Sequence, residues 1–165
     1  MPAFADDQSG ITDAATMRGR DWPSLRQFCV FLENRVGRLH DLLRHIERYD
    51  LKVVGLCVVD SADFAVARLI LSETDRAREL FNLSKFSFIE NDILGVVLPD
   101  SSQPFLEVFL ALMSAELNIS YAYPILYRCE NRGAVALYVD NIDQAYTVLA
   151  EKGFIPVTEN DLLGN

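Results

Sequence analysis

Apolar residues between positions 25 and 49 follow two different spacings, one after the other. The first part, 25–32, ends in a continuous apolar run that is typical of a buried β-strand. Apolar side chains then recur at i, i+3, i+4 and i+7, the stripe of an amphipathic helix, at Leu39, Leu42, Leu43 and Ile46. We therefore predict a strand over 25–32 and a helix over 38–49. Gly37 permits tight loop angles between them, and Asn34 is a candidate helix cap.

The same alternation of spacings continues to residue 90. A β-branched run and a second apolar run are separated by a Ser-Ala-Asp turn, and a short helical pattern leads into a further strand. The predicted elements are strands over 51–60, 64–71 and 86–90 and a helix over 75–81. The resulting order, β-α-β-β-α-β, is the split βαβ arrangement of a ferredoxin-like unit.

A second copy of this order begins at residue 93. Its first helix carries a stripe offset by 67 positions from the earlier one, at Leu106, Phe109, Leu110 and Met113. The other predicted elements are strands over 93–98, 118–127, 134–139 and 154–157 and a helix over 142–152. A pattern that repeats over several elements with almost no drift indicates a tandem duplication. We interpret both helical stripes as faces turned toward the core.

Composition and charge narrow the class of protein. Half of the 165 residues are hydrophobic, and 24 acidic against 15 basic residues give a net charge of −9. No block of Lys or Arg is present, which argues against a nucleic-acid partner. The three cysteines are far apart, which favours a reducing cytoplasm. No apolar run approaches the roughly 18 residues of a membrane span. Residues 1–22 are predicted to form a disordered tail, and Met1 and Met17 are both candidate starts.

Candidate catalytic chemistry is missing from the sequence. His40 and His45 point in different directions on a helix, so they do not share a metal. No serine has a nearby histidine, and no glycine-rich phosphate loop is present. We therefore predict no enzyme activity, no cofactor and no metal site. The roles of two features remain open. Arg68 lies in an apolar strand and is expected either to form an ion pair or to contact a ligand. Tyr121, Tyr123 and Tyr127 share one strand face, which suits either packing or the stacking of a ligand.

Two tandem units, each opening with a strand, a loop and a Leu-rich helix, resemble the ACT domain family over residues 25–163. The loop of that family commonly has the form Asn-x-Pro-Gly-x-Leu, and here it is Asn34-Arg-Val-Gly-Arg-Leu39. The resemblance implies an α+β fold with ACT domains over 23–91 and 92–165. It implies that the two units lie side by side in an eight-stranded antiparallel sheet with helices on one face.

The resemblance also implies a regulatory module that binds a free amino acid, apolar or branched-chain, at the junction of the units. The residues carried over are Asn34, Arg35, Val36, Gly37, Arg38 and Leu39 of the first loop, and Asn118 of the facing strand. The second loop has Pro104 and Phe105 where glycine is expected, and Lys52 faces it, so one competent pocket is predicted.

The expected partners of such a module are a second copy of the chain, as a homodimer, and a metabolic enzyme. The principal alternative is an assembly module without ligand binding, similar to the regulatory subunits of acetolactate synthase in their use of ACT units. A small enzyme on the same fold is the remaining alternative.

Overall fold

A computed structural model describes residues 24–164 of the chain. The tail predicted over residues 1–22 therefore lies outside the described residues. The elements along the chain are β1 Ser24–Glu33, α1 Arg38–Arg48, β2 Val53–Asp60, β3 Phe64–Leu71, α2 Thr74–Leu83, β4 Ser87–Val97, α3 Pro104–Met113, β5 Ile119–Cys129, β6 Arg132–Val139, α4 Ile142–Glu151, β7 Pro156–Val157 and α5 Glu159–Leu163. Two units of alternating strands and helices are present, as the sequence pattern predicted.

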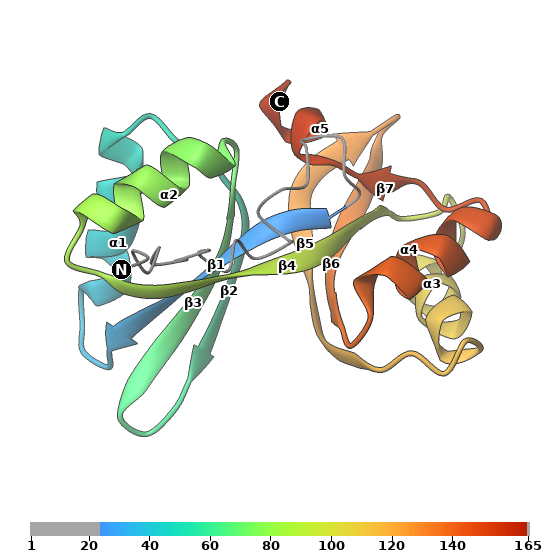
Figure 1. The fold of residues 1–165 in the computed structure, drawn as a ribbon, viewed down its shortest axis with the longest axis horizontal. Coiled ribbons are helices and arrows are strands. Elements are labelled where there is room, and N and C mark those ends of the chain that lie inside the picture. Colours follow the sequence, from blue (N-terminus) through green and yellow to red (C-terminus); the bar gives the residue numbers. More distant parts are fainter. Residues whose placement is uncertain (1–23, 165) are drawn as a thin grey trace, which may run out of the picture.

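The strand β4 joins the two units in a way that the sequence did not predict. Separate strands were expected over 86–90 and 93–98, but Ser87–Val97 is one continuous strand (Figure 1). Its first part pairs with β1, from Ser87 to Leu94, and its last part pairs with β6, from Leu94 to Val97. β4 is thus the fourth strand of the first unit and the first strand of the second. The proposed domain boundary at 91/92 falls inside it.

This shared strand closes the sheet. The strand order is β1-β3-β2-β5-β6-β4-β7, and β1 also pairs with β4. The strands β1 to β6 therefore form a closed ring, and β7 lies outside it. The prediction of eight strands side by side was wrong, because the last strand expected of the first unit and the first strand expected of the second are one continuous strand. Closure also pairs strand edges that an open sheet would expose.

Three apolar clusters fill the molecule. One lies between the first unit's strands and α1 and α2, around Phe28, and one lies between the second unit's strands and α3 and α4, around Leu112. Figure 1 shows these helix pairs at opposite ends of the molecule. The third cluster lies inside the closed sheet, because alternate residues of each strand face inward. Its members include Leu25, Ile70 and Ile93.

The helical stripes had different outcomes. In α1, Leu42 and Ile46 are buried and Leu39 and Leu43 pack against the same cluster, so that prediction is confirmed. In α3 the buried side chains are those of Val108, Ala111 and Leu112. The predicted stripe was wrong for most of its members, which are 46–65% exposed: Leu106, Leu110 and Met113.

Candidate functional site

The loop between β1 and α1 begins the candidate site. Gly37 is the N-cap of α1 and has φ +92°, a left-handed backbone angle that L side chains rarely adopt. This confirms the conformational role expected of Gly37. Asn34 is not the cap, because its side-chain amide donates instead to Asp60 Oδ1 at 2.9 Å. The loop residues 34–37 are all exposed.

The start of α1 offers hydrogen-bond donors to an anion. No side chain caps this helix end, and helices leave N–H groups in their first turn without intrahelical partners. The neighbouring Arg38 guanidinium lies 5.7 Å above the Phe86 ring and 3.7 Å from Asp41. Its Nε is buried and has no hydrogen-bond partner among the described residues. Backbone N–H groups and a guanidinium together suit a carboxylate.

Asn118, the predicted contribution of the second unit, is exposed immediately before β5. The two units meet between β2 and β5, whose backbone pairing consists of Gly55 with Ile125. Beyond this pair the strands are not hydrogen-bonded, so pairing does not bring Asn118 against the first loop. Within residues 24–164 the structure thus shows no contact between the first loop and Asn118.

Two apolar grooves flank the β2–β5 junction. One has a volume of about 510 Å³ and the other about 410 Å³. Phe105 and Phe109 of α3 lie over β5 in the larger groove, and Leu43 of α1 lies over β2 and β5 in the smaller. Pro124 contributes to both. These volumes fall in the range typical of small-molecule sites, roughly 300–1,000 Å³.

None of the residues predicted for the site lines either groove. The sequence did single out Tyr121 and Tyr123, which line the larger groove, as candidates for stacking or packing. Phe105 was interpreted there as an obstacle to binding. Pro124 was missed, because a proline within a strand carries no pattern that marks a junction between units.

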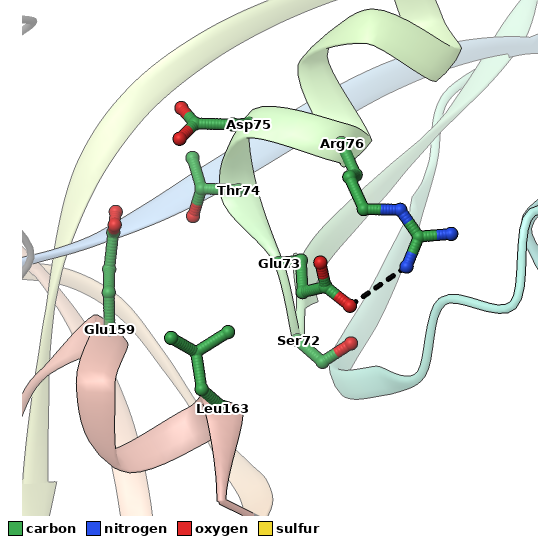
Figure 2. A pocket seen from close by; sticks show the side chains of 7 residues that line it. All are labelled: Ser72, Glu73, Thr74, Asp75, Arg76, Glu159 and Leu163. Carbon is green, nitrogen blue, oxygen red and sulfur yellow. Dashed lines mark hydrogen bonds and ion pairs between the residues drawn. The ribbon is translucent and has the colours of Figure 1, made fainter.

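A smaller, acidic pocket lies between the start of α2 and α5 (Figure 2). Its volume is about 60 Å³, far below the roughly 300 Å³ at the lower end of ligand sites. Its lining includes the carboxylates of Glu73, Asp75 and Glu159, and Arg76 pairs with Glu73 at 2.9 Å. This surplus of negative charge opposes a carboxylate ligand. We interpret the pocket as the seam that holds α5 against the first unit.

Glu159 gives this seam a dependence on pH. Burial raises the pKa of its carboxyl above the ordinary 4.5, Asp75 raises it further, and a hydrogen bond from Thr74 and the charges of Arg26 and Arg78 oppose the rise. The folded state therefore favours protonated Glu159. The stabilisation that comes from this protonation is complete when the pH is below the pKa of Glu159 in the unfolded chain. It is lost as the pH rises through the higher pKa of Glu159 in the folded protein.

We accordingly expect Glu159→Gln to unfold at a temperature equal to or above that of the wild type at pH 7. The advantage should shrink as the pH falls through the raised pKa and should be lost below 4.5, because the wild-type carboxyl is then neutral as well. Thermal melts between pH 4 and pH 7 measure this, with the exposed Glu151→Gln as control. A Glu159→Gln protein whose destabilisation grew with rising pH would contradict the assignment.

A polar layer crosses the interior of the closed sheet. Gln27 is fully buried, and its amide donates to Asn91 Oδ1 at 2.9 Å and to the Tyr121 hydroxyl at 2.8 Å. The Tyr123 hydroxyl in turn donates to Gln27 Oε1 at 2.6 Å. Burial raises the pKa of both tyrosines, so both hydroxyls stay protonated at physiological pH. This network joins β1, β4 and β5 and therefore both units.

Within residues 24–164 no three His, Cys, Asp or Glu side chains are grouped as a metal site would require. No helix in this described part is long and apolar enough to cross a membrane.

A sequence profile of the family described as an ACT domain pair matches residues 24–164. The chain belongs to this family. ACT domains are regulatory modules, so the family places the protein among regulatory rather than catalytic chains. No curated protein matches it significantly.

Several solved structures are similar to this ACT domain pair. Protein BT0572 from Bacteroides thetaiotaomicron is 26% identical, with a TM-score of 0.77, and the match covers 86% of this chain and 97% of that one. The regulatory subunit of aspartate kinase from Thermus thermophilus, in its ligand-free form, is 13% identical with a TM-score of 0.57 over 82% and 96%. A structure of aspartokinase α and β subunits is 11% identical with a TM-score of 0.50 over 78% and 91%. The two aspartate kinase structures share the fold.

Proposed function

We propose that this ACT domain pair is a non-catalytic regulatory module that binds a free amino acid at the junction of its two units. The observation that carries the proposal is the start of α1, where an uncapped helix end and the unpartnered Nε of Arg38 adjoin the left-handed Gly37. A carboxylate satisfies both kinds of donor at once. The regulatory subunit of aspartate kinase, which shares the fold, is named for a regulatory role.

Each loop residue has a role in this proposal. The backbone of Gly37, Arg38 and Leu39 and the Arg38 guanidinium receive the carboxylate. Asn34 uses its amide nitrogen for Asp60, which leaves Oδ1 as an acceptor for the ligand's ammonium group. The exposed segment at Arg35 and Val36 and the side chain of Leu39 favour an apolar or branched-chain ligand.

Asn118 completes the site from the second unit. Because the strands diverge beyond Gly55 and Ile125, ligand binding would draw the start of β5 toward the first loop. A ligand that binds the closed arrangement better than the open one shifts the population between them. That shift is the signal that a partner enzyme or a second copy of the chain would receive in the cytoplasm.

A thermal-shift screen against the twenty amino acids tests this proposal. Ligand at a hundred times Kd should add about 2.7 kcal/mol to the free energy of unfolding. For a domain of this size that corresponds to a rise of several degrees in Tm, about 2–4 °C per kcal/mol. One amino acid or a chemically related few should produce the rise. If none does at millimolar concentration, the protein does not bind amino acids in this way.

The apolar outer face of α3 favours a second candidate function, an assembly module without a ligand, comparable to the acetolactate synthase regulatory subunits. Leu106, Leu110 and Met113 are exposed on one helix, an arrangement that marks interaction surfaces. We expect the wild type to form a homodimer through this face.

Leu110→Glu should convert that homodimer to a monomer, because it places a charge at the centre of the apolar face. Sedimentation velocity measures the change, and Glu107→Gln is the control on the same helix. A wild type that is monomeric at micromolar concentration, or a dimer that Leu110→Glu leaves intact, would exclude this face as the interface.

A further inference from the structure

The inner face of the closed sheet carries a guanidinium that has no carboxylate partner among residues 24–164. Arg68 of β3 lies opposite Cys29 of β1 and Cys57 of β2, so its side chain belongs to the inward row. Its guanidinium lies 3.8 Å from the centre of the Tyr121 ring. It also lies beside the Cys29 thiol and lowers its pKa, although burial has the larger effect and raises it.

The ion pair expected of Arg68 is not formed within residues 24–164. The half-buried arginine instead relies on an aromatic face and a neutral thiol. Arg26, on the outer face of β1, shows the contrast, because it pairs with Glu90 at 3.3 Å and with Asp92 at 3.2 Å. A cation taken partly out of water is stabilised much better by an anion than by a ring alone. Arg68 therefore offers an open binding group.

Next to Arg68 the inner face is apolar and partly exposed. Phe31 and Phe64 meet edge to face with ring centres 5.9 Å apart, at the end of the sheet where β1 stops and β3 begins. In the strand register, Ile89 lies opposite Cys29, and Val59 lies opposite Val66. Four large apolar side chains of this region are 38–53% exposed: Phe31, Val59, Phe64 and Ile89.

The other side of Arg68 is polar and blocked. The Gln27 network and Tyr123 fill the sheet interior there, and Leu25 and Ile70 close it beyond. A molecule that approaches Arg68 along the exposed inner face passes Phe31 and Phe64. It needs an anionic group at its leading end and an apolar group behind it.

From this arrangement we infer that the open end of the closed sheet binds a small monocarboxylate with an apolar chain. The carboxylate pairs with the guanidinium of Arg68, and the chain packs on Phe31, Phe64 and Ile89. The site lies on the inner face of the sheet, whereas α1 packs on the outer face and Asn118 precedes β5 in the second unit. It is independent of the amino-acid site proposed above, and no ammonium-binding group is required of its ligand.

Calorimetric titration with hexanoate, hexanamide and acetate tests the inference on the full chain. Hexanoate should bind, and hexanamide should bind at least about tenfold more weakly because it lacks the charge. Acetate should also be at least about tenfold weaker, because it lacks the chain that covers the apolar side chains. Failure of hexanoate to bind at millimolar concentration would overturn the inference, as would equal affinity for hexanamide.

Variants locate the site. Arg68→Met should weaken hexanoate binding at least about tenfold, and Arg68→Lys should weaken it less, because a point charge replaces the bidentate fork. The exposed Arg128→Met is the control and should bind as the wild type does. Unchanged affinity in either Arg68 variant would overturn the inference, and Arg68→Lys preserves the test if Arg68→Met does not fold.

A second pair of variants tests the apolar part. Phe64→Ser should reduce the affinity for hexanoate and leave that for acetate nearly unchanged, whereas Phe105→Ser, on α3, should change neither. If Gly37→Val or Asn118→Ala weakened hexanoate as much as Arg68→Met does, the carboxylate would be binding at the junction of the units, and the separate inner site would be wrong.

Discussion

Phe28→Ala should destabilise the protein by about 3–5 kcal/mol, the usual cost of removing a buried phenylalanine ring. Phe28 is completely buried on the helix side of β1. Its ring contacts Phe81 of α2 at a centroid distance of 5.2 Å and Phe88 of β4 at 6.2 Å. The substitution would leave a cavity where a helix and two strands meet.

Phe31→Ala is the matched control for this prediction. It removes the same ring from the same strand, but Phe31 is 38% exposed and faces the other side of the sheet. Its cost should be smaller by about 2 kcal/mol or more. Urea unfolding of both variants provides the comparison. If both substitutions lowered the free energy of unfolding equally, the assignment of Phe28 to the helix side and of Phe31 to the inner side of β1 would be wrong.

Gln27→Leu is expected to lower the free energy of unfolding by about 2–4 kcal/mol, the second largest effect among the substitutions proposed. Leucine fills nearly the same space, so the loss is that of hydrogen bonding. Three buried or half-buried groups lose their partner: the hydroxyls of Tyr123 and Tyr121 and the amide oxygen of Asn91. Each buried polar group left without a partner costs about 1–3 kcal/mol. The exposed Gln144→Leu should stay within about 0.5 kcal/mol of the wild type.

The double variant Gln27→Leu/Tyr123→Phe sharpens this test. It removes both the Tyr123 hydroxyl and its acceptor, so one orphaned group disappears. The double variant should therefore be less destabilised than the sum of the two single variants, by about 1 kcal/mol. Strict additivity would show that the 2.6 Å bond does not contribute to stability.

Local patterns in the sequence predicted most elements because each has a clear period and clear ends. The α1 stripe succeeded because polar residues separate its apolar positions. The α3 segment failed because it is apolar almost all round, so spacing did not select the buried face. The short α5 was missed, although Thr158 and Asp161 form a capping box that the sequence displays.

Closure of the sheet could not be predicted from periodicity. Asn91 and Asp92 look like a turn between two apolar runs, yet both stay in β4. Asn91 is held by Gln27, 64 positions earlier, and Asp92 by Arg26. Such long-range partners have no local signature. For the same reason the sequence predicted the loop at Gly37 but neither the grooves beside Pro124 nor the open guanidinium of Arg68.

The central claim is that one amino-acid site is shared by both units. It is tested most directly by calorimetric titration, in which the amino acid that stabilises the protein most in the screen is added to two variants and to a matched control of each. Gly37→Val and Asn118→Ala change different units. Their controls are Gly153→Val, at another left-handed glycine, and the exposed Asn82→Ala. We predict that the first two weaken binding at least about tenfold and that the controls stay within about twofold. Binding that survives both Gly37→Val and Asn118→Ala would contradict a shared site.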